Sequence, residues 1–309
     1  MKSEETGKKS FAQELITNFS KKKKIIPSKF HYDLKGSKYF EKITKTKEYY
    51  VTRVEKEILK KIVNQRDLIF NHNLTFVEFG SGSTEKISIL LNKNVKFYVP
   101  LDVSFEFIKL SSKKLLRSFP KLKIIPTYCD YTKYVKLPKK ISKTKIGFFL
   151  GSSIGNFYNN EEKKFLKNAK KTLGKNSFLL VGVDLIKNPI ILKKAYNDKN
   201  KFTAKFNLNL INIMNNKFKT KLKLKDFKYM ATFNKMKSSM ENFIVSNKNQ
   251  YFFIKKNKFH LKKNEKIQTE ISNKFTISKF NKLAQSSGWQ VKKHWNDAKR
   301  YYAVFLLQA

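Results

Sequence analysis

The middle of the chain alternates between short apolar runs and longer stretches with apolar residues at helical spacing. The strand-like runs are 74–79, 96–102, 123–130, 145–151 and 177–184. Amphipathic stretches such as 104–119 and 160–173 lie between them, and the second ends before Gly174, a typical helix stop. Alternating strands and helices form parallel sheets, because each helix returns the chain to the start of the next strand. The sequence therefore predicts a doubly wound α/β core over residues 56–188.

The pattern changes after this core. A helical stretch over 189–218 leads into short strand-like runs at 240–246, 250–256 and 266–272. These runs indicate an antiparallel region outside the core. A predicted helix over 276–288 and two further strand-like runs, 289–295 and 301–307, end the chain. A hairpin of this kind would complete a seven-stranded sheet, so we expect the chain to return to its first domain.

The chain is strongly basic, with 67 Lys and Arg against 23 Asp and Glu among 309 residues, for a formal charge of +44. Such a charge can indicate a polyanionic partner, because cationic surfaces displace counterions from phosphates. The lysines are spread along the sequence, however, and short runs such as 21–24 and 255–258 carry no RNA-binding aromatic motif. We favour a solvated basic surface and expect no nucleic acid partner; functional attraction to polyanions is the alternative.

Cysteine, histidine and apolar patterning exclude several classes of protein. Cys129 is the only cysteine, so a disulfide framework is excluded and a reducing cytoplasm is expected. No apolar run approaches the roughly 18 residues of a membrane helix, and residues 1–10 do not form a signal peptide. We expect a cytoplasmic protein, without a membrane partner or a bound metal, because the histidines lack ligand spacing. The histidines are His31, His72, His260 and His294.

The stretch 79-FGSGSTEK-86 follows the first predicted strand and contains a G-x-G pattern. It lacks the third glycine of a dinucleotide loop and is not a Walker loop, so alone it predicts a tight turn as readily as a nucleotide site. Asp102 ends the next strand, where a carboxylate can accept both ribose hydroxyls; it could instead cap the following helix. Asp130 and Tyr131 follow the third strand and could hold an adenine amino group. Together these features fit S-adenosylmethionine better than NAD.

A further motif, 150-LGSSIGNF-157, follows the fourth predicted strand. Its small residues would leave the backbone open beside a cofactor, and Asn156 offers a donor and an acceptor from one amide. Gly155 and Asn156 could equally form only a turn.

In combination, these motifs resemble one family, the L-histidine Nα-methyltransferases of ergothioneine biosynthesis. These enzymes use S-adenosylmethionine to trimethylate the amino group of histidine, which gives hercynine. The matching stretches run in order along nearly the whole chain: 30-FHYDLKGSKYFEKIT-44, 48-EYYVTRVEKEIL-59, 77-VEFGSGSTEK-86, 99-VPLDVS-104, 148-FFLGSSIGNF-157, 181-VGVDLIKNP-189, 195-AYND-198, 203-TAKFNLNLI-211 and 269-TEISNKFT-276.

The resemblance implies a class I methyltransferase fold, with a Rossmann-like seven-stranded sheet and a second, substrate-binding domain. The S-adenosylmethionine-binding core would comprise residues 56–188 and 278–309. The substrate domain would comprise residues 1–55 and 189–277, that is, the N-terminal segment and an insertion. We expect the protein to be a monomer.

The resemblance also implies roles for individual residues. The cofactor contacts would be Gly80, Lys86, Asp102, Asp130 and Tyr131. The carboxylate and amine of the amino acid would be held by Tyr49, Asn156 and Tyr196, with Tyr32 nearby, and Glu270 and Ser272 would bind the imidazole. Tyr49, or a water held by Tyr32 and Asn156, would pass the proton of the amine to solvent. The tyrosines could instead be core residues, and Glu270 and Ser272 could be outward-facing residues of an alternating strand.

One departure from the family bears on the substrate, and the loop over 255–266 is also shorter than is usual in the family. Where the family has an acidic residue followed by a methionine that packs on the substrate ring, 240-MENFIVS-246 has Glu241 and then Asn242. Either Asn242 takes the place facing the ring, or a shift brings Met240 to it. Two alternatives therefore stay open: methyl transfer to another aromatic amino acid such as a tryptophan derivative, and a nucleic-acid-binding methyltransferase.

Overall fold

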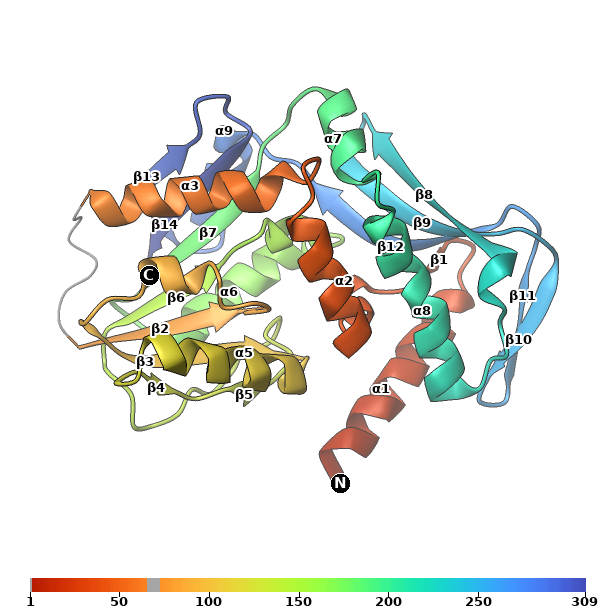
Figure 1. Cartoon of the computed structure of the whole chain (residues 1–309), viewed down its shortest axis with the longest axis horizontal. Helices are drawn as coiled ribbons and strands as arrows, with labels where there is room; N and C mark the ends of the chain where they lie inside the picture. The colour runs from red at the N-terminus through yellow and green to blue at the C-terminus, as the bar shows by residue number, and fades with distance from the viewer. Residues whose placement is uncertain (1, 66–72) are drawn as a thin grey trace. The chain divides into compact units, whose positions relative to one another are not determined.

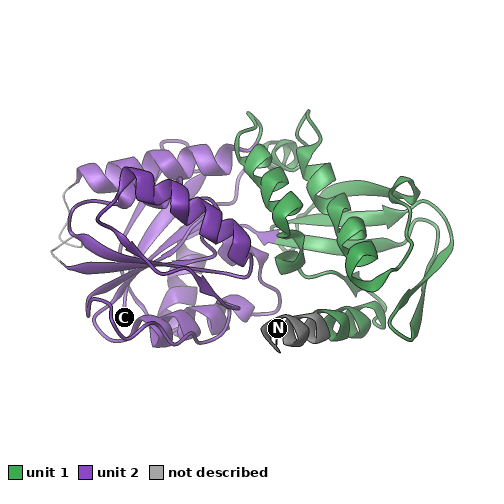
Figure 2. Cartoon of the chain, turned by 60° about the horizontal axis from the view of Figure 1, so that its bottom comes forward, with its two compact units in different colours: residues 1–48, 189–271 green, residues 49–188, 272–309 purple. Residues whose placement is uncertain are grey.

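The structure is a computed structural model that describes residues 2–65 and 73–309, and side chains from residue 11 onward. The chain forms two compact units (Figure 2). Unit 1 comprises residues 1–48 and 189–271, and unit 2 comprises residues 49–188 and 272–309. The domain boundaries expected from the sequence lie at 55/56, 188/189 and 277/278, and the two units of the structure meet at 48/49, 188/189 and 271/272. The assignment of cofactor binding to one domain and substrate binding to the other stays a prediction.

Unit 2 is built on one mixed sheet (Figure 1). Its strands are β2 (Leu74–Phe79), β3 (Val95–Asp102), β4 (Lys123–Ile124), β5 (Thr127–Tyr128), β6 (Lys145–Phe149), β7 (Phe178–Asp184), β13 (Gln290–Asn296) and β14 (Tyr302–Gln308). The spatial order is β13-β14-β7-β6-β2-β3-β4, and β5 also pairs with β3. Strands β2 to β7 pair in parallel, whereas β14 runs antiparallel to both its neighbours. The expected C-terminal hairpin is therefore confirmed as part of the first sheet.

The expected strand over 123–130 is divided into β4 and β5, which share the position beside β3. The division falls at Ile125 and Pro126, and proline has no backbone N–H to donate to a neighbouring strand. The following step also differs from the expected β/α repeat, because residues 129–144 form turns instead of a helix. Pro138 lies in the middle of that segment and is incompatible with a helix interior.

Helices cover both faces of this sheet. They are α3 (Tyr50–Asn64), α4 (Ile87–Leu90), α5 (Phe105–Ser118), α6 (Glu161–Leu173) and α9 (Ile277–Ser286). Val181 and Val183 of β7 pack into a cluster with α6 and α9. Gly182, between them, faces α3, because a Cβ there would lie 2.0 Å from a Glu55 carboxylate oxygen. The alternation of side chains along β7 thus separates the two helical layers.

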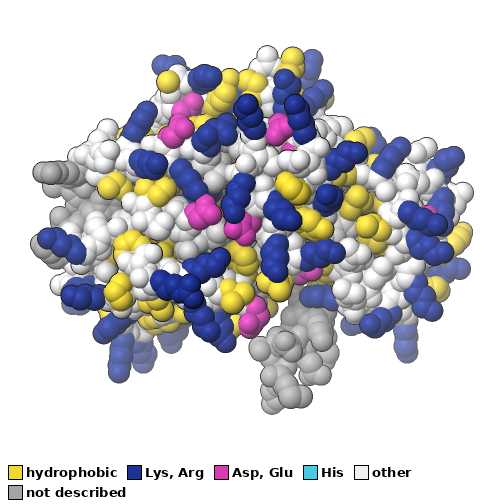
Figure 3. Space-filling model, viewed as in Figure 1, with side chains coloured by type: hydrophobic (Ala, Val, Ile, Leu, Met, Phe, Trp, Pro, Cys, Tyr) yellow, Lys and Arg dark blue, Asp and Glu magenta, His cyan; other side chains and the backbone are white. Residues whose placement is uncertain are grey.

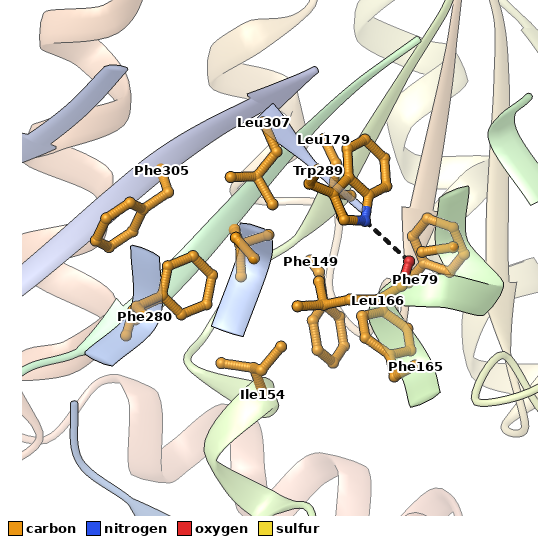
Figure 4. Close-up of a cluster of buried hydrophobic side chains, with 14 of the residues drawn as sticks. Phe79, Phe149, Ile154, Phe165, Leu166, Leu179, Phe280, Trp289, Phe305 and Leu307 are labelled. Atoms are coloured by element: carbon orange, nitrogen blue, oxygen red, sulfur yellow. Dashed lines mark hydrogen bonds between the residues drawn. The ribbon is translucent and has the colours of Figure 1, made fainter. Parts of the chain in front are cut away.

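The core between the sheet, α6 and α9 is aromatic and fully buried (Figure 4). Phe165 contacts Phe149 and Phe79, with ring centroids 4.1 and 5.6 Å away. Trp289 is 2% exposed, and its indole N–H donates to the carbonyl of Leu166 at 2.9 Å. This bond satisfies the polar group of an otherwise apolar side chain and ties the start of the C-terminal hairpin to α6.

Unit 1 combines helices with a smaller sheet. Its elements are α1 (Lys2–Phe19), β1 (Lys24–Ile25), η1 (Ser28–His31), α2 (Leu34–Thr44), α7 (Pro189–Ala195), α8 (Phe202–Phe218), η3 (Leu224–Asp226), β8 (Phe227–Asn234), β9 (Ser239–Ser246), β10 (Gln250–Ile254), β11 (Asn257–Leu261) and β12 (Lys266–Asn273), the last two residues of which belong to unit 2. The sheet order is β1-β12-β9-β8, and β10 and β11 form a separate hairpin. The expected antiparallel pairing is found for β8 with β9 and for β10 with β11.

The helical stretch expected over 189–218 is two helices. Asp198 lies between them, and its carboxylate accepts the backbone N–H groups of Phe202 and Thr203 at 2.7 and 2.8 Å. These are N–H groups that the first turn of α8 cannot satisfy itself, so Asp198 fixes the start of the second helix. None of the helices in the described part of the chain is long and apolar enough to span a membrane.

Candidate functional site

The glycine loop after β2 leaves part of its backbone open. Gly80 and Gly82 have φ values of +72° and +47°, in a backbone region that residues other than glycine rarely adopt. A Cβ on Gly80 would meet the hydroxyl of Tyr131 at 3.0 Å, whereas a Cβ on Gly82 would meet nothing within 4 Å. The loop is therefore packed at its first glycine and faces open space at its second, where a ligand can approach the main chain.

Asp102, the last residue of β3, lies directly against this loop. Its Oδ2 accepts the N–H of Gly82 at 3.3 Å, and its Oδ1 accepts the N–H of Ser104 at 2.9 Å. The side chain is 9% exposed, and burial raises its pKa, although the backbone N–H groups oppose that shift. Ser104, not Asp102, occupies the N-cap position of α5. Asp102 thus links two adjacent strand ends, and each oxygen keeps a lone pair for a further donor.

Asp130 and Tyr131 stand at the next strand end. The Oδ1 of Asp130 accepts from the backbone N–H and the hydroxyl of Thr132, at 3.2 and 2.5 Å. Its Oδ2 accepts no hydrogen bond from the residues that the structure describes. The phenol of Tyr131 lies over Gly80. The structure thus gathers at one edge of the sheet the loop and the two acids expected there.

This arrangement fits S-adenosylmethionine. A nucleoside needs a carboxylate for its ribose hydroxyls and an acceptor for its exocyclic amine, and Asp102 and Asp130 supply these chemical types. The open main chain at Gly82 allows close approach. The roles of the individual residues, Gly80, Lys86 and Tyr131 included, stay predictions.

Lys86 has a partner that sequence reasoning missed. Its ammonium pairs with Glu55 of α3 at 2.6 Å, and the Glu55 side chain is fully buried. The Glu55 carboxylate also accepts the hydroxyl of Tyr302 at 2.6 Å and the N–H of Gly151 at 2.8 Å. Gly182 leaves the space for this carboxylate, since a Cβ there would collide with it. The signal in the sequence was an acid on the apolar stripe of a helix, where buried charges need partners.

Glu78 of β2 is a second buried acid below the glycine loop. It is 3% exposed and accepts the hydroxyl of Tyr98 from the neighbouring strand. Burial raises the pKa of Glu78 to about 8, against the opposing effects of the Tyr98 hydrogen bond and of Lys86. A neutral Glu78 carboxyl is therefore favoured in the folded chain at neutral pH.

The residues expected to bind the substrate are divided between the units. Tyr49, Asn156 and Ser272 belong to unit 2. Tyr49 is the N-cap of α3, and Asn156 ends the short helix η2 (Ser153–Asn156) after β6. Tyr49 is 9% and Ser272 3% exposed, so both are available only to a ligand that enters the protein.

Tyr32, Tyr196 and Glu270 belong to unit 1. Tyr32 packs beside Phe40 and Phe206, with ring centroids 5.8 and 5.6 Å away. Tyr196 follows α7 and is 8% exposed. Glu270 is on β12 and is half-buried.

Asn242 lies beside Glu270. Its amide donates to the Glu270 Oε2 at 2.6 Å, and its Oδ1 is 2.9 Å from the hydroxyl of Tyr229, which also reaches the carbonyl of Tyr196 at 2.9 Å. Burial, followed by the charge of Glu270, raises the pKa of Tyr229. Asn242 is therefore next to Glu270, and β8 and β9 pair without a shift in register. Which of Asn242 and Met240 would face a substrate ring is not decided by these contacts.

The three histidines that the structure describes are not grouped as a metal site would need. His31 is buried against Phe206, and burial lowers its pKa to about 4. His260 and His294 stack on Tyr251 and Phe305, and His72 lies outside the described residues. Within the described part of the chain, no three His, Cys, Asp or Glu side chains are grouped as a metal site would need.

Comparisons with known proteins agree with this geometry. The family model for histidine-specific, SAM-dependent methyltransferases matches residues 11–309. The chain is 28% identical over 244 residues to a histidine N-alpha-methyltransferase of Mycobacterium tuberculosis, which covers 77% of this chain and 75% of that protein. It is 26% identical over 319 residues to the N-methyltransferase imqF of Aspergillus flavus, with 98% and 86% covered.

The fold itself is shared with solved structures. The magnesium protoporphyrin IX methyltransferase of Synechocystis aligns with a TM-score of 0.51 at 8% identity, over 91% of this chain and 98% of that chain. At this identity the likeness concerns the fold alone. Unit 2 has the class I S-adenosylmethionine-dependent methyltransferase fold, and the smaller sheet is additional to it.

We expect Glu55→Gln to lower the free energy of unfolding by about 1–3 kcal/mol. The neutral amide forms no ion pair with Lys86, and its NH2 group would face one of the donors that the carboxylate accepts. S-adenosylmethionine should also bind more weakly. Urea denaturation and calorimetric titration measure the two effects. The matched control is Glu41→Gln, whose Lys45 partner has a 63% exposed side chain and which should cost less than about 0.5 kcal/mol. Equal, small losses in both variants would contradict the role of Glu55.

A second expectation concerns pH. The pKa of Glu78 rises from 4.5 to about 8 on folding, so the folded chain holds a proton that the unfolded chain has lost between these values. Its contribution to stability is full below about pH 4.5 and is lost as pH rises through about 8. Relative to Glu78→Gln, the wild-type free energy of unfolding should therefore fall between about pH 5 and 9 by at least about 1 kcal/mol. Glu57→Gln, at an exposed position of α3, is the control; a wild-type curve parallel to that of Glu78→Gln would show the assignment to be wrong.

Proposed function

The chain belongs to the histidine-specific, S-adenosylmethionine-dependent methyltransferase family, and we propose that it methylates the α-amino group of L-histidine, repeatedly, to give hercynine. The observation that carries the proposal is the Glu270 carboxylate, which the Asn242 amide holds in place at 2.6 Å. A positioned carboxylate can accept the N–H of an imidazole, which an aliphatic amino acid does not offer. Ergothioneine biosynthesis is the pathway that this product would serve.

The roles proposed for the substrate residues follow from their chemistry. Tyr49, Tyr196 and Asn156 would hold the carboxylate and amine of the substrate, because phenol and amide groups bind a carboxylate without adding charge. Glu270 and Ser272 would bind the imidazole from β12. The buried positions of Tyr49 and Tyr196 support this assignment, since hydrogen bonds to a ligand are stronger where water is excluded.

The proposed cofactor residues would position the methyl donor. Asp102 would accept the ribose hydroxyls, Asp130 would accept the adenine amine with Tyr131 beside it, and Gly80 and Lys86 would contact the donor at the loop. Bound S-adenosylmethionine supplies an activated methyl group on a sulfonium. The protein then needs no nucleophilic side chain: its contribution is alignment of the substrate amine, an effect that can supply several kcal/mol.

The amine must be neutral to accept a methyl group, and each of the first two transfers leaves a proton to be removed before the next. We assign this step to Tyr49, or to a water held by Tyr32 and Asn156, as a relay to solvent. The proposed setting is the cytoplasm, and no metal or nucleic acid takes part.

A second candidate is the same transfer to another aromatic amino acid. It is favoured by Asn242, which stands where the family typically has a methionine, and by the similarity to a fungal N-methyltransferase not named for histidine. An indole offers one N–H and no ring acceptor, so it would use Glu270 but leave the hydroxyl of Ser272 without a ring nitrogen.

The face of the molecule drawn in Figure 3 does not favour a nucleic acid substrate. On the face drawn in Figure 3, Lys and Arg side chains are scattered over both units instead of forming one stripe. Nucleic acid sites gather cationic side chains along the backbone they follow. The basic charge is therefore better explained as a solvated surface.

The acceptor can be identified directly. We expect purified protein incubated with S-adenosylmethionine and each standard amino acid to yield methylated products from L-histidine, at mass increments of one, two and three methyl groups. Mass spectrometry measures the methylated products. The control is the Asp102→Ala variant, which should yield fewer of them. Labelling of a different amino acid, with histidine unchanged, would overturn the proposal.

Glu270→Ala should raise the KM for histidine about 10- to 100-fold, because it removes a charge-assisted hydrogen bond to the ring. The Kd for S-adenosylmethionine should stay within about twofold. The matched control is Glu241→Ala: Glu241 is on β9 and pairs with Asn234 instead of Asn242. If Glu270→Ala weakened the cofactor and histidine equally, Glu270 would not be a ring-binding residue.

A further inference from the structure

Unit 2 contains a buried ionic cluster that the proposed reaction does not yet use. Asp184, at the end of β7, is fully buried and pairs with Lys274 at 2.7 Å and with Lys187 at 2.5 Å. The hydroxyl of Tyr50 donates to the same carboxylate at 2.8 Å. The neighbouring lysines lower the pKa of Asp184 although burial alone would raise it, so the carboxylate stays ionised.

Lys274 also contacts Ser272. Its ammonium lies 2.7 Å from the Ser272 Oγ, and the two residues are 1% and 3% exposed. An ammonium carries only donors, so the hydrogen bond must run from Lys274 to the serine oxygen. This bond occupies a lone pair of Oγ and leaves the hydroxyl proton for an acceptor.

Whether the Ser272 hydroxyl donates or accepts matters because Ser272 is buried. A buried donor without an acceptor costs about 1–3 kcal/mol, whereas the Ser272 oxygen already accepts from the ammonium and is satisfied as an acceptor. A ligand beside Ser272 is therefore favoured if it presents a bare ring nitrogen and disfavoured if it presents an N–H.

We propose that Lys274 is a positioning residue that fixes Ser272 as a hydrogen-bond donor, so that the protein selects amino acids whose ring carries an acceptor nitrogen. The inference rests on the proposed function, in which Ser272 binds the substrate ring. It defines the substrate class as azole amino acids in which one ring nitrogen lacks a proton, such as neutral histidine, and it disfavours pyrroles and indoles.

The test uses ring isosteres of histidine. Thiazolylalanine presents an acceptor nitrogen without an N–H, and pyrrolylalanine presents an N–H without an acceptor. The two regioisomers of each place the nitrogen at either position that it has in histidine. Their Kd values are measured calorimetrically with S-adenosylhomocysteine present, for the wild type and for Ser272→Ala.

We expect Ser272→Ala to weaken one thiazolylalanine isomer about three- to tenfold and to leave both pyrrolylalanine isomers within about twofold. Ser287→Ala is the matched control, because Ser287, the C-cap of α9, is equally buried and its hydroxyl donates to the carbonyl of Leu283. A pyrrolylalanine isomer that lost as much affinity as thiazolylalanine would show that Ser272 accepts, and would overturn the inference while histidine methylation could still hold. Wild-type protein that methylated another amino acid and left L-histidine unchanged would overturn the proposed function and the inference with it.

Variants of Lys274 test whether Lys274 is the reason that Ser272 acts as a hydrogen-bond donor. Lys274→Met removes the donors, so the serine hydroxyl can turn, and the preference for thiazolylalanine over pyrrolylalanine should shrink to within about twofold. Lys274→Arg keeps a cationic donor and should keep the preference. A Lys274→Met protein that binds S-adenosylhomocysteine normally and keeps the full preference would show that Lys274 does not act through Ser272. If that variant does not fold, the comparison of wild type with Ser272→Ala decides the donor role.

Discussion

The packing around the glycine loop of unit 2 depends on the buried carboxylate of Glu55. This one group accepts from Lys86, Gly151 and Tyr302, which come from the glycine loop, the end of β6 and the last strand. A buried carboxylate is costly unless its oxygens are satisfied, and removing any partner exposes that cost. The helix, the loop and the two strands are therefore held in one arrangement, and the absence of a side chain at Gly182 is a condition for it.

Much of unit 2 could be predicted from the sequence, because buried parallel strands are recognisable as apolar runs and their carboxyl ends meet at one edge of the sheet. Asp102, Asp130 and the glycine loop were placed at that edge on this argument alone, and the structure brings them together. Glu55 was missed because its partners are far away in sequence. The break at Pro126 was missed because the surrounding residues favour a strand. The missing backbone N–H of the proline interrupts that strand in spite of them.

Unit 1 shows a different limit. Strands β8 and β11 were not predicted, since neither has the clear alternation of a half-buried strand; their stability comes from pairing with β9 and β10. The contact between Asn242 and Glu270 likewise joins two strands that are distant in the chain. The sequence left open whether Asn242 or Met240 takes the place of the family's methionine, and only the fold shows that the Asn242 amide donates to a carboxylate.

The two residues of β12 proposed to bind the ring offer hydrogen bonds in opposite directions, because a carboxylate accepts and the serine hydroxyl beside Lys274 has a proton to donate. The Glu270 carboxylate accepts the amide N–H of Asn242 at 2.6 Å. Ser272 receives the ammonium of Lys274, which leaves it a donor. A ring that meets both would need one N–H and one bare nitrogen, and neutral imidazole has this pair. These neighbours have partners of their own, because the Asn242 Oδ1 is 2.9 Å from the Tyr229 hydroxyl and Lys274 pairs with Asp184 at 2.7 Å. Selectivity on this basis comes from the cost of unpaired buried groups, which is larger than the gain from a matched one.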